Sequence, residues 1–182
     1  MMRVFLSLLL LLWATTNSYA DEAVPALASS GVGVAQNAAA GWAEDAYLVY
    51  VENDEGLAAG GKSSRWGYLF YSPERNAARA YSVQDGKVVT QQNLGFKFKA
   101  PPVSAEWVDS TVALLAANDK GGRKFCEEHG GAAESVFLMR AAIHESEPNM
   151  TTWTIVYKAA GVPSLFVVVD AKNGKVKRKW RG

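Results

Sequence analysis

The sequence predicts an α+β protein of two tandem units, each a helix packed on an antiparallel β-sheet of about four strands. Three observations lead to this prediction. Short segments in which apolar and polar residues alternate indicate strands, and Asp-Gly or Asn-Gly pairs between them indicate tight hairpins. An apolar stretch ahead of the strands in the second half indicates a helix. The same order of helix and strands occurs twice along the chain, which favours two copies of one plan.

The correspondence between the halves is clearest in two strands that begin with tryptophan. The residues of the second strand lie at a constant offset of 87 from those of the first. We predict that both rows face a covering helix, although a carbohydrate-stacking platform is the alternative for such aromatic rows. We call these residues the structural repeat core: Trp66, Tyr68, Phe70, Trp153, Ile155 and Tyr157.

The first unit is predicted over residues 34–100, after a flexible lead-in at 21–33. An alanine-rich helix is expected at 34–42, a strand at 46–53 and an exposed loop at 54–64. The strand "RWGYLFYS" follows, closed by Ser72-Pro73. Two further strands are expected on either side of Asp85-Gly86, because glycine tolerates the positive φ that the turn demands.

The second unit is predicted over residues 101–182. Asp109 or Ser110 caps a helix by offering a side-chain oxygen to free backbone N–H groups. This helix is expected to stop near Asn118, to resume through Phe125 and to end at His129. Strands are expected in "ESVFLMRAAI" and "TWTIVYKA", followed by two strands around a turn at Asn173-Gly174.

The first twenty residues have the pattern of a secretory signal peptide at 1–20. A short positive start precedes an apolar stretch too short to span a bilayer, and small residues at Ser18 and Ala20 suit signal peptidase. We expect cleavage after Ala20, a secreted or periplasmic location, and no membrane span in the mature chain. No cysteine comes directly after the apolar stretch, at the position where a lipid would be attached, and this is evidence against a lipid anchor.

Charge and cysteine content bear on two points, a nucleic-acid partner and an internal disulfide. Removing Arg3 from the 19 basic residues leaves 18, which balances the 18 acidic residues. A neutral chain does not predict a nucleic-acid partner. Cys126 is the single cysteine, so no internal disulfide is available.

The glycine pair Gly121-Gly122, followed by Arg123-Lys124, has two readings. A phosphate loop of the Walker type lies between a strand and a helix and has serine or threonine after its lysine, and neither condition holds here. We therefore predict that Gly121 takes a left-handed conformation, and that Gly122 permits a close approach or a change of direction.

The residues suited to catalysis or metal binding form no convincing set. Cys126 and His129 lie one helical turn apart, but no second pair of ligands is nearby, and we predict structural roles for both. The segment "ENDEG" at 52–56 lacks the full ligand spacing of a calcium loop. "HESE" at 144–147 is read as a solvated turn, and Asn149-Met150-Thr151 is a glycosylation sequon. We expect no catalytic residues, no metal and no cofactor.

The last segment, "KVKRKWRG", is the predicted binding segment: Lys175, Lys177, Lys179, Trp180 and Arg181. Lysines on a final strand commonly prevent edge-to-edge aggregation. The same residues could form a basic strip for an acidic protein or an anionic wall polymer. Both readings stay open from the sequence.

The segments described above also resemble a known family. The helix "DSTVALLAANDKGGRKF", the tryptophan-led strand and "VDAKNGKV" resemble the PepSY-type unit of bacterial secreted proteins, most clearly over 109–180. "WAEDAYL" and "RWGYLFYSP" resemble the first unit of tandem proteins of this kind. Such units are proposed to bind or restrain proteases, and the β-lactamase inhibitor proteins use tandem units of a related shape, an analogy of fold alone.

The sequence therefore predicts an exported, non-catalytic binding protein that inhibits or restrains a secreted enzyme or an envelope partner. The partner is an unidentified secreted or envelope protein, or a wall polymer. Contacts are expected from the loops at 54–64 and 141–149 and from the basic end strand. The alternatives are a small secreted hydrolase that uses carboxylates or Cys126, and a structural accessory domain.

Overall fold

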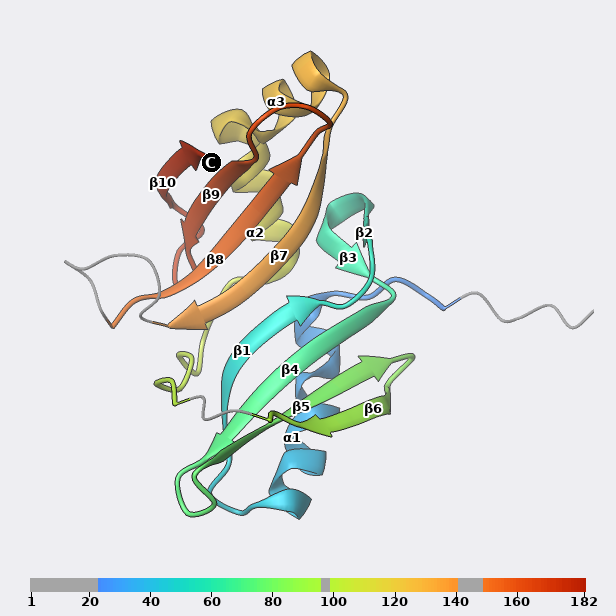
Figure 1. The fold of residues 1–182 in the computed structure, drawn as a ribbon, viewed down its shortest axis with the longest axis vertical. Coiled ribbons are helices and arrows are strands. Elements are labelled where there is room, and N and C mark those ends of the chain that lie inside the picture. The colour runs from blue at the N-terminus through green and yellow to red at the C-terminus, as the bar shows by residue number, and fades with distance from the viewer. Residues whose placement is uncertain (1–22, 96–98, 141–148) are drawn as a thin grey trace, which may run out of the picture.

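The computed structural model describes residues 23–95, 99–140 and 149–182. Within these residues, eight strands form one antiparallel sheet in the order β10-β9-β8-β7-β1-β4-β5-β6 (Figure 1). Their bounds are β1 Tyr47–Asn53, β4 Arg65–Ser72, β5 Ala77–Gln84, β6 Lys87–Asn93, β7 Ala132–Arg140, β8 Thr151–Lys158, β9 Leu165–Asp170 and β10 Val176–Arg181. The protein is dominated by this sheet.

The prediction of two tandem units, each a helix on its own sheet of about four strands, is wrong. Strand β1 pairs with β4 on one side and with β7 on the other, so the strands of both halves belong to one sheet. The β1–β7 register aligns Tyr50 with Met139, Val51 with Leu138 and Glu52 with Phe137. Alternation and turn residues specify individual strands and hairpins, but not which distant edges pair. An edge strand left open would expose unpaired N–H and C=O groups, and the β1–β7 pairing removes two such edges.

The hairpin turns follow from their residues. Strands β5 and β6 meet at Asp85-Gly86, where φ is 48° and 69°. Two consecutive residues with positive φ match the right-handed twist of a two-residue hairpin. Strands β9 and β10 are joined through Gly174, with φ 72°, as the sequence predicted. Both predicted turns are confirmed.

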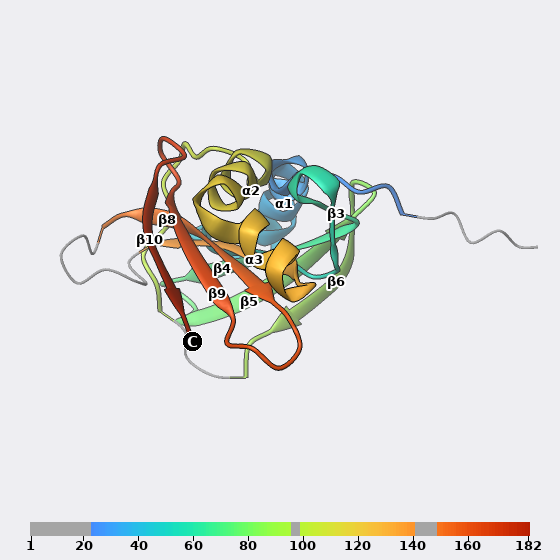
Figure 2. The ribbon, with the colours of Figure 1, turned by 90° about the horizontal axis from the view of Figure 1, so that it is seen from above.

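The helices lie together on one side of the sheet (Figure 2). Helix α1 (Val32–Trp42) follows a short 3-10 turn, η1 (Ala28–Gly31). Helix α2 (Ser110–Ala117) continues through a π-helical segment, η3 (Asn118–Gly122), into α3 (Arg123–His129). The Asp109 side chain accepts a hydrogen bond from the Ser110 N–H and caps α2, as predicted.

The glycine pair has the role that the sequence predicted. Gly121 has a φ of 135°, and the helix passes through the π-helical segment at this point. A Cβ on Gly122 would lie 2.2 Å from the Tyr157 ring, so glycine lets the helix touch the sheet here. Gly130, with φ 62°, ends α3 in the left-handed conformation.

The main core lies between the helices and the sheet. The structural repeat core is buried in it, with exposed fractions of 2% or less for Trp66, Tyr68, Phe70, Trp153, Ile155 and Tyr157. The two tryptophans of the structural repeat core each donate their indole N–H to a backbone carbonyl that precedes a helix. Trp66 donates to Ala26 at 2.9 Å, and Trp153 donates to Val108 at 2.7 Å. These bonds tie the chain ahead of each helix to the sheet.

The segment at 54–64, expected as an exposed loop, has its own short structure. Strands β2 (Leu57–Ala58) and β3 (Lys62–Ser63) pair around a 3-10 turn, η2 (Ala59–Gly61). The Thr111 hydroxyl at the start of α2 donates to the Gly60 carbonyl. A Cβ on Gly61 would lie 2.8 Å from the Ser110 carbonyl oxygen, so this turn packs directly on α2.

Candidate functional site

The sheet has one face covered by helices and an opposite face that no described helix covers (Figure 2). Side chains alternate between the two faces along each strand. A β-bulge in β1, between Leu48 and Tyr50, sends both Val49 and Tyr50 to the uncovered face. At one corner of this face, Leu94 and Ala100 pack against a small second core.

Aromatic pairs mark the uncovered face. Tyr50 of β1 stacks with Phe137 of β7, with ring centroids 5.7 Å apart. Phe166 of β9 stacks with Trp180 of β10, at 5.0 Å and an interplanar angle of 6°. All four residues are partly exposed. Large apolar rings that remain accessible on a sheet face are the side chains that anchor protein interfaces.

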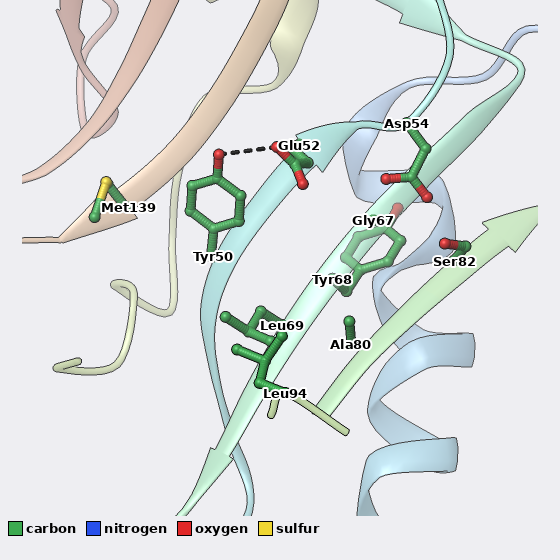
Figure 3. A pocket seen from close by; sticks show the side chains of 10 residues that line it. All are labelled: Tyr50, Glu52, Asp54, Gly67, Tyr68, Leu69, Ala80, Ser82, Leu94 and Met139. Atoms are coloured by element: carbon green, nitrogen blue, oxygen red, sulfur yellow. Dashed lines mark hydrogen bonds between the residues drawn. The ribbon is translucent and has the colours of Figure 1, made fainter. Parts of the chain in front are cut away.

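A hollow of about 300 Å³ opens on this face over β1, β4 and β5 (Figure 3). Its lining is mostly apolar, with two carboxylates among it. The residues that line it are Tyr50, Glu52, Asp54, Gly67, Tyr68, Leu69, Ala80, Ser82, Leu94 and Met139. The volume lies at the lower end of the range for ligand sites in proteins.

Small residues in neighbouring strands create the hollow. Gly67 lies opposite Glu52 of β1 and Ser82 of β5, so the middle of this row carries no side chain. A Cβ at Gly67 would lie 2.4 Å from Asp54 Oδ1, which means that the carboxylate occupies the space above the glycine. A glycine inside a strand often marks such a close approach.

Glu52 lies beside the Tyr50 hydroxyl, which donates a hydrogen bond to Glu52 Oε2 at 2.9 Å (Figure 3). The residue is exposed, and the surrounding protein shields part of its side chain from solvent. This burial raises the pKa of the Glu52 carboxyl, the hydrogen bond from Tyr50 lowers it, and the Asp54 charge raises it; the net shift is upward. Burial also raises the pKa of Tyr50, so the phenol stays protonated.

Asp54 has few partners for a carboxylate. Its Oδ2 atom is shielded from solvent and accepts no hydrogen bond within the described residues. The Arg65 Nε atom lies 3.8 Å away, while an Arg65 terminal nitrogen lies 2.6 Å from Glu55 Oε1. One guanidinium is thus shared between Asp54 and Glu55, and with Glu52 this end of the hollow carries more negative than positive groups.

The hollow combines carboxylates with a mostly apolar lining. Across residues 23–95, 99–140 and 149–182, no group of three or more His, Cys, Asp or Glu side chains converges as metal ligands would. The lining residues with an ionisable or hydroxyl group are Tyr50, Glu52, Asp54, Tyr68 and Ser82. What the hollow offers is an apolar floor, an aromatic wall and carboxylates at one end.

The predicted binding segment is divided between the two faces of the sheet. Trp180 lies on the uncovered face, stacked on Phe166. Lys179 and Arg181 point to the helix side: the Lys179 ammonium donates to the Lys120 carbonyl at 2.9 Å, and the Arg181 guanidinium lies 4.6 Å from the Phe125 ring centroid. Lys175 precedes β10, and Lys177 lies in a β-bulge of that strand. A single strip on one side of the strand is therefore not formed, and a binding role for these residues stays a prediction.

Cys126 and His129 lie on α3, away from the hollow. Cys126 is partly buried, and this burial, with the nearby Glu127 charge, raises the pKa of its thiol. The His129 ring packs edge-on against Phe125, with centroids 5.1 Å apart. The other histidine, His144, and the predicted contact loop up to residue 148 fall outside the described residues.

Sequence reasoning missed the hollow, although two signals for it were present. Tyr50, Glu52 and Asp54 alternate in "YVEND", which places one phenol and two carboxylates on the same side of the chain. Gly67 interrupts an otherwise bulky strand, which indicates that another group approaches it closely. From the sequence, these carboxylates are interpreted as an incomplete calcium loop, or as unassigned carboxylates of a hydrolase.

Comparisons with known proteins support the fold alone. A scan against protein-family models found no match, and a search of curated proteins also found none. Among solved structures, the chain is similar to the crystal structure of a "putative lipoprotein" from Clostridium difficile 630, with a TM-score of 0.55 and 12% sequence identity. The similarity covers 84% of this chain and 93% of that chain. Among the described residues, none of the helices has the length and apolar character needed to cross a bilayer.

Proposed function

We propose that the chain is an exported, non-catalytic binding protein that holds a secreted or envelope protein on the uncovered face of its sheet. The observation that carries this proposal is the face itself. Two stacked aromatic pairs and an apolar hollow lie on a surface that no described helix covers. A sheet with one face on the core and one face on solvent normally presents polar residues to water, so accessible rings here favour a docking surface.

Two observations support export. The first twenty residues have the signal-peptide pattern. The solved structure with a similar fold is described as a lipoprotein, a class of proteins held at the cell envelope. Kinship with PepSY-like secreted proteins, proposed on residues 109–180, would give the same location and a role in restraining a partner.

The end strand extends the proposed surface. Trp180 continues the uncovered face beyond β9, and Arg178 lies 5.1 Å from the Trp180 ring centroid. Arginine and tryptophan are the side chains most often found at the centre of protein interfaces. We propose that this edge contributes to partner contact together with the hollow.

Photo-crosslinking in the native host tests this proposal. A photoreactive residue replaces Phe137 on the uncovered face, and a matched variant carries it at Leu115, which is 53% exposed on α2 on the helix side. We expect a discrete protein adduct from position 137 and none from position 115. Equal labelling at both positions, or turnover of a substrate that is lost in Cys126→Ser while folding is kept, would overturn the proposal in favour of the hydrolase alternative.

A further inference from the structure

We infer that the hollow is a socket for an arginine side chain of the partner protein. Its aliphatic stem would lie on the apolar floor and its guanidinium would meet Glu52. This inference rests on the proposed function, because it names the chemistry by which that partner is anchored. Three features of the hollow support it: its charge, its apolar lining and its aromatic wall.

The first feature is charge. Glu52 and Asp54 both line the hollow, and the nearest cation, Arg65, is shared with Glu55. Three carboxylates, those of Glu52, Asp54 and Glu55, are therefore balanced by a single guanidinium in this part of the surface. The Oδ2 atom of Asp54 is shielded from solvent and has no hydrogen-bond partner among the described residues, so a bound cation compensates what the free protein lacks. Charge complementarity therefore selects a positively charged occupant.

The second feature is the lining, which limits the kind of cation. Leu69, Ala80 and Leu94 form an apolar floor below the carboxylates (Figure 3). A hydrated metal ion would gain nothing from this floor, and it would find too few ligands. A cation on a hydrocarbon stem satisfies both ends of the hollow, because long basic side chains bury their stems along apolar surface.

The third feature is the neighbouring aromatic wall. The Tyr50 ring lines the hollow and stacks on Phe137, so a flat cation can lie against its face. Guanidinium is planar and weakly hydrated, and it binds carboxylates in a fork, which makes arginine a better occupant than lysine. The hollow opens on the uncovered face, where a side chain projecting from a docked protein would enter.

The test uses purified mature protein and a blocked arginine, N-acetyl-arginine N-methylamide, titrated in NMR. The matched probe is the citrulline analogue, which has the same shape without the charge. We expect saturable shifts of the Gly67 and Ser82 amides with arginine and affinity weaker by about tenfold or more for citrulline. Equal affinity for the two probes, or saturable shifts confined to other parts of the protein, would overturn the inference.

A pair of variants separates the socket from general surface charge. Glu52→Gln keeps the shape and an acceptor for Tyr50, and we expect it to weaken arginine binding by about tenfold. Glu128→Gln, an exposed carboxylate beside Lys124 on α3, should leave binding unchanged. An unaltered affinity in Glu52→Gln would show that this carboxylate does not hold the cation.

The pH dependence gives an independent readout. The groups that act on the ionisation of Glu52 are Tyr50 and Asp54, and Arg65 lies 3.8 Å from Asp54. Tyr50 stays protonated because burial raises its pKa, and the pKa of the Glu52 carboxyl lies above its ordinary value. Arginine affinity should therefore rise as Glu52 ionises with increasing pH, and this rise should vanish in Glu52→Gln. A pH profile shared by both proteins contradicts the inference.

A further experiment distinguishes failure of the socket from failure of the proposed function. Photo-crosslinking from position 137 is repeated in a Glu52→Gln background. A loss of the adduct supports the socket, whereas an undiminished adduct overturns the socket and leaves the docking face intact. Arginine binding without any adduct would point to a free cationic ligand, which overturns a protein as the source of the guanidinium.

Discussion

Gly122 shows how a single hydrogen atom in place of a methyl group sets the distance between a helix and the sheet. Its φ of −60° suits any residue, so the reason for glycine is space alone. The Tyr157 ring fills the position that a Cβ would take, and its hydroxyl donates to Asn118 at 2.8 Å. The helix, its π-helical segment and β8 are therefore joined at one point.

Gly122→Ala is expected to lower the free energy of unfolding by about 1–3 kcal/mol, because the new methyl overlaps the Tyr157 ring. Urea unfolding followed by circular dichroism measures the change. Gly33→Ala is the matched control, since Gly33 has open space around it within α1. That substitution should raise stability by about 0.5–1 kcal/mol. Equal stability of Gly122→Ala and the parent protein would contradict the packing described here.

Gly122 and Gly67 both have close contacts, but the sequence predicts the role of Gly122 better than that of Gly67. Gly121-Gly122 stands between two helical stretches, where a change of direction is required, so its role was predictable. Gly67 stands inside a strand, and the group that approaches it belongs to a loop thirteen residues earlier, Asp54. Nothing local specifies that approach, and the hollow could not be predicted in full for this reason.

Glu52→Gln is expected to raise the stability of the free protein at neutral pH. The folded protein raises the pKa of this carboxyl, so the folded state holds its proton more tightly than the unfolded chain does. The ionised form therefore costs stability, and this cost grows as pH rises from the unfolded pKa through the folded one. The stability gain of Glu52→Gln, measured by urea unfolding, should be present at pH 7 and absent near pH 3. A gain that is independent of pH would contradict the assignment.

At the scale of elements, Asp109 links two segments that are 80 residues apart. Its carboxylate accepts from the Ser110 N–H at 2.7 Å and from the Ser29 N–H at 3.3 Å, and the Ser29 hydroxyl also donates to it. The Ser110 hydroxyl accepts from the Ala28 N–H at 3.3 Å. The cap of α2 is thus also the support of η1, the turn that leads into α1.

Asp109→Ala should lower the free energy of unfolding by about 2 kcal/mol, the upper range for a lost helix cap, because two backbone segments lose an acceptor. Asp119→Ala is the control. Asp119 is 70% exposed and pairs with the exposed Arg123 four residues later, so its loss should change stability by about 0.5 kcal/mol or less. Thermal unfolding by calorimetry compares the two, and similar losses would refute the linking role of Asp109.

Elements were predictable where local residues determine them. Strand β4 has the bounds that alternation and Ser72-Pro73 indicated, and both hairpin turns carry the expected glycines. The β-bulges were not predictable, because an extra residue in one strand is defined only against its partner. The β1–β7 pairing joins residues such as Val51 and Leu138, and no local pattern specifies a partner so far along the chain.

At the scale of the whole molecule, the β1–β7 seam joins four strands on each side. The seam has three aligned residue pairs, and the Asn53 side chain extends it. Asn53 Oδ1 accepts from the Val136 N–H at 2.7 Å, and its amide donates to the Glu134 and Glu55 carbonyls at 3.0 and 2.8 Å. One amide side chain therefore completes the backbone pairing where the strands diverge.

Because the sheet is continuous, we expect the protein to unfold in one cooperative step, with coincident urea midpoints from tryptophan fluorescence and circular dichroism. Asn53→Ala should lower the unfolding free energy by about 2 kcal/mol, since the Val136 N–H and two backbone carbonyls lose their partner. Asn93→Ala, at the exposed end of β6, should change it by about 0.5 kcal/mol or less. Two separated transitions in the parent protein would argue against a single sheet as the folding unit.

The β-bulge at Val49 affects the local bend of the sheet but not which side chains lie on each face. Without Val49, the residues from Tyr47 to Glu52 would still alternate in the same sense, so every functional group would keep its side. The strand would lose only its local kink and the contacts of one valine. Natural variation in the length of this strand would therefore reshape the surface offered to a partner while every group that recognises charge stays in place.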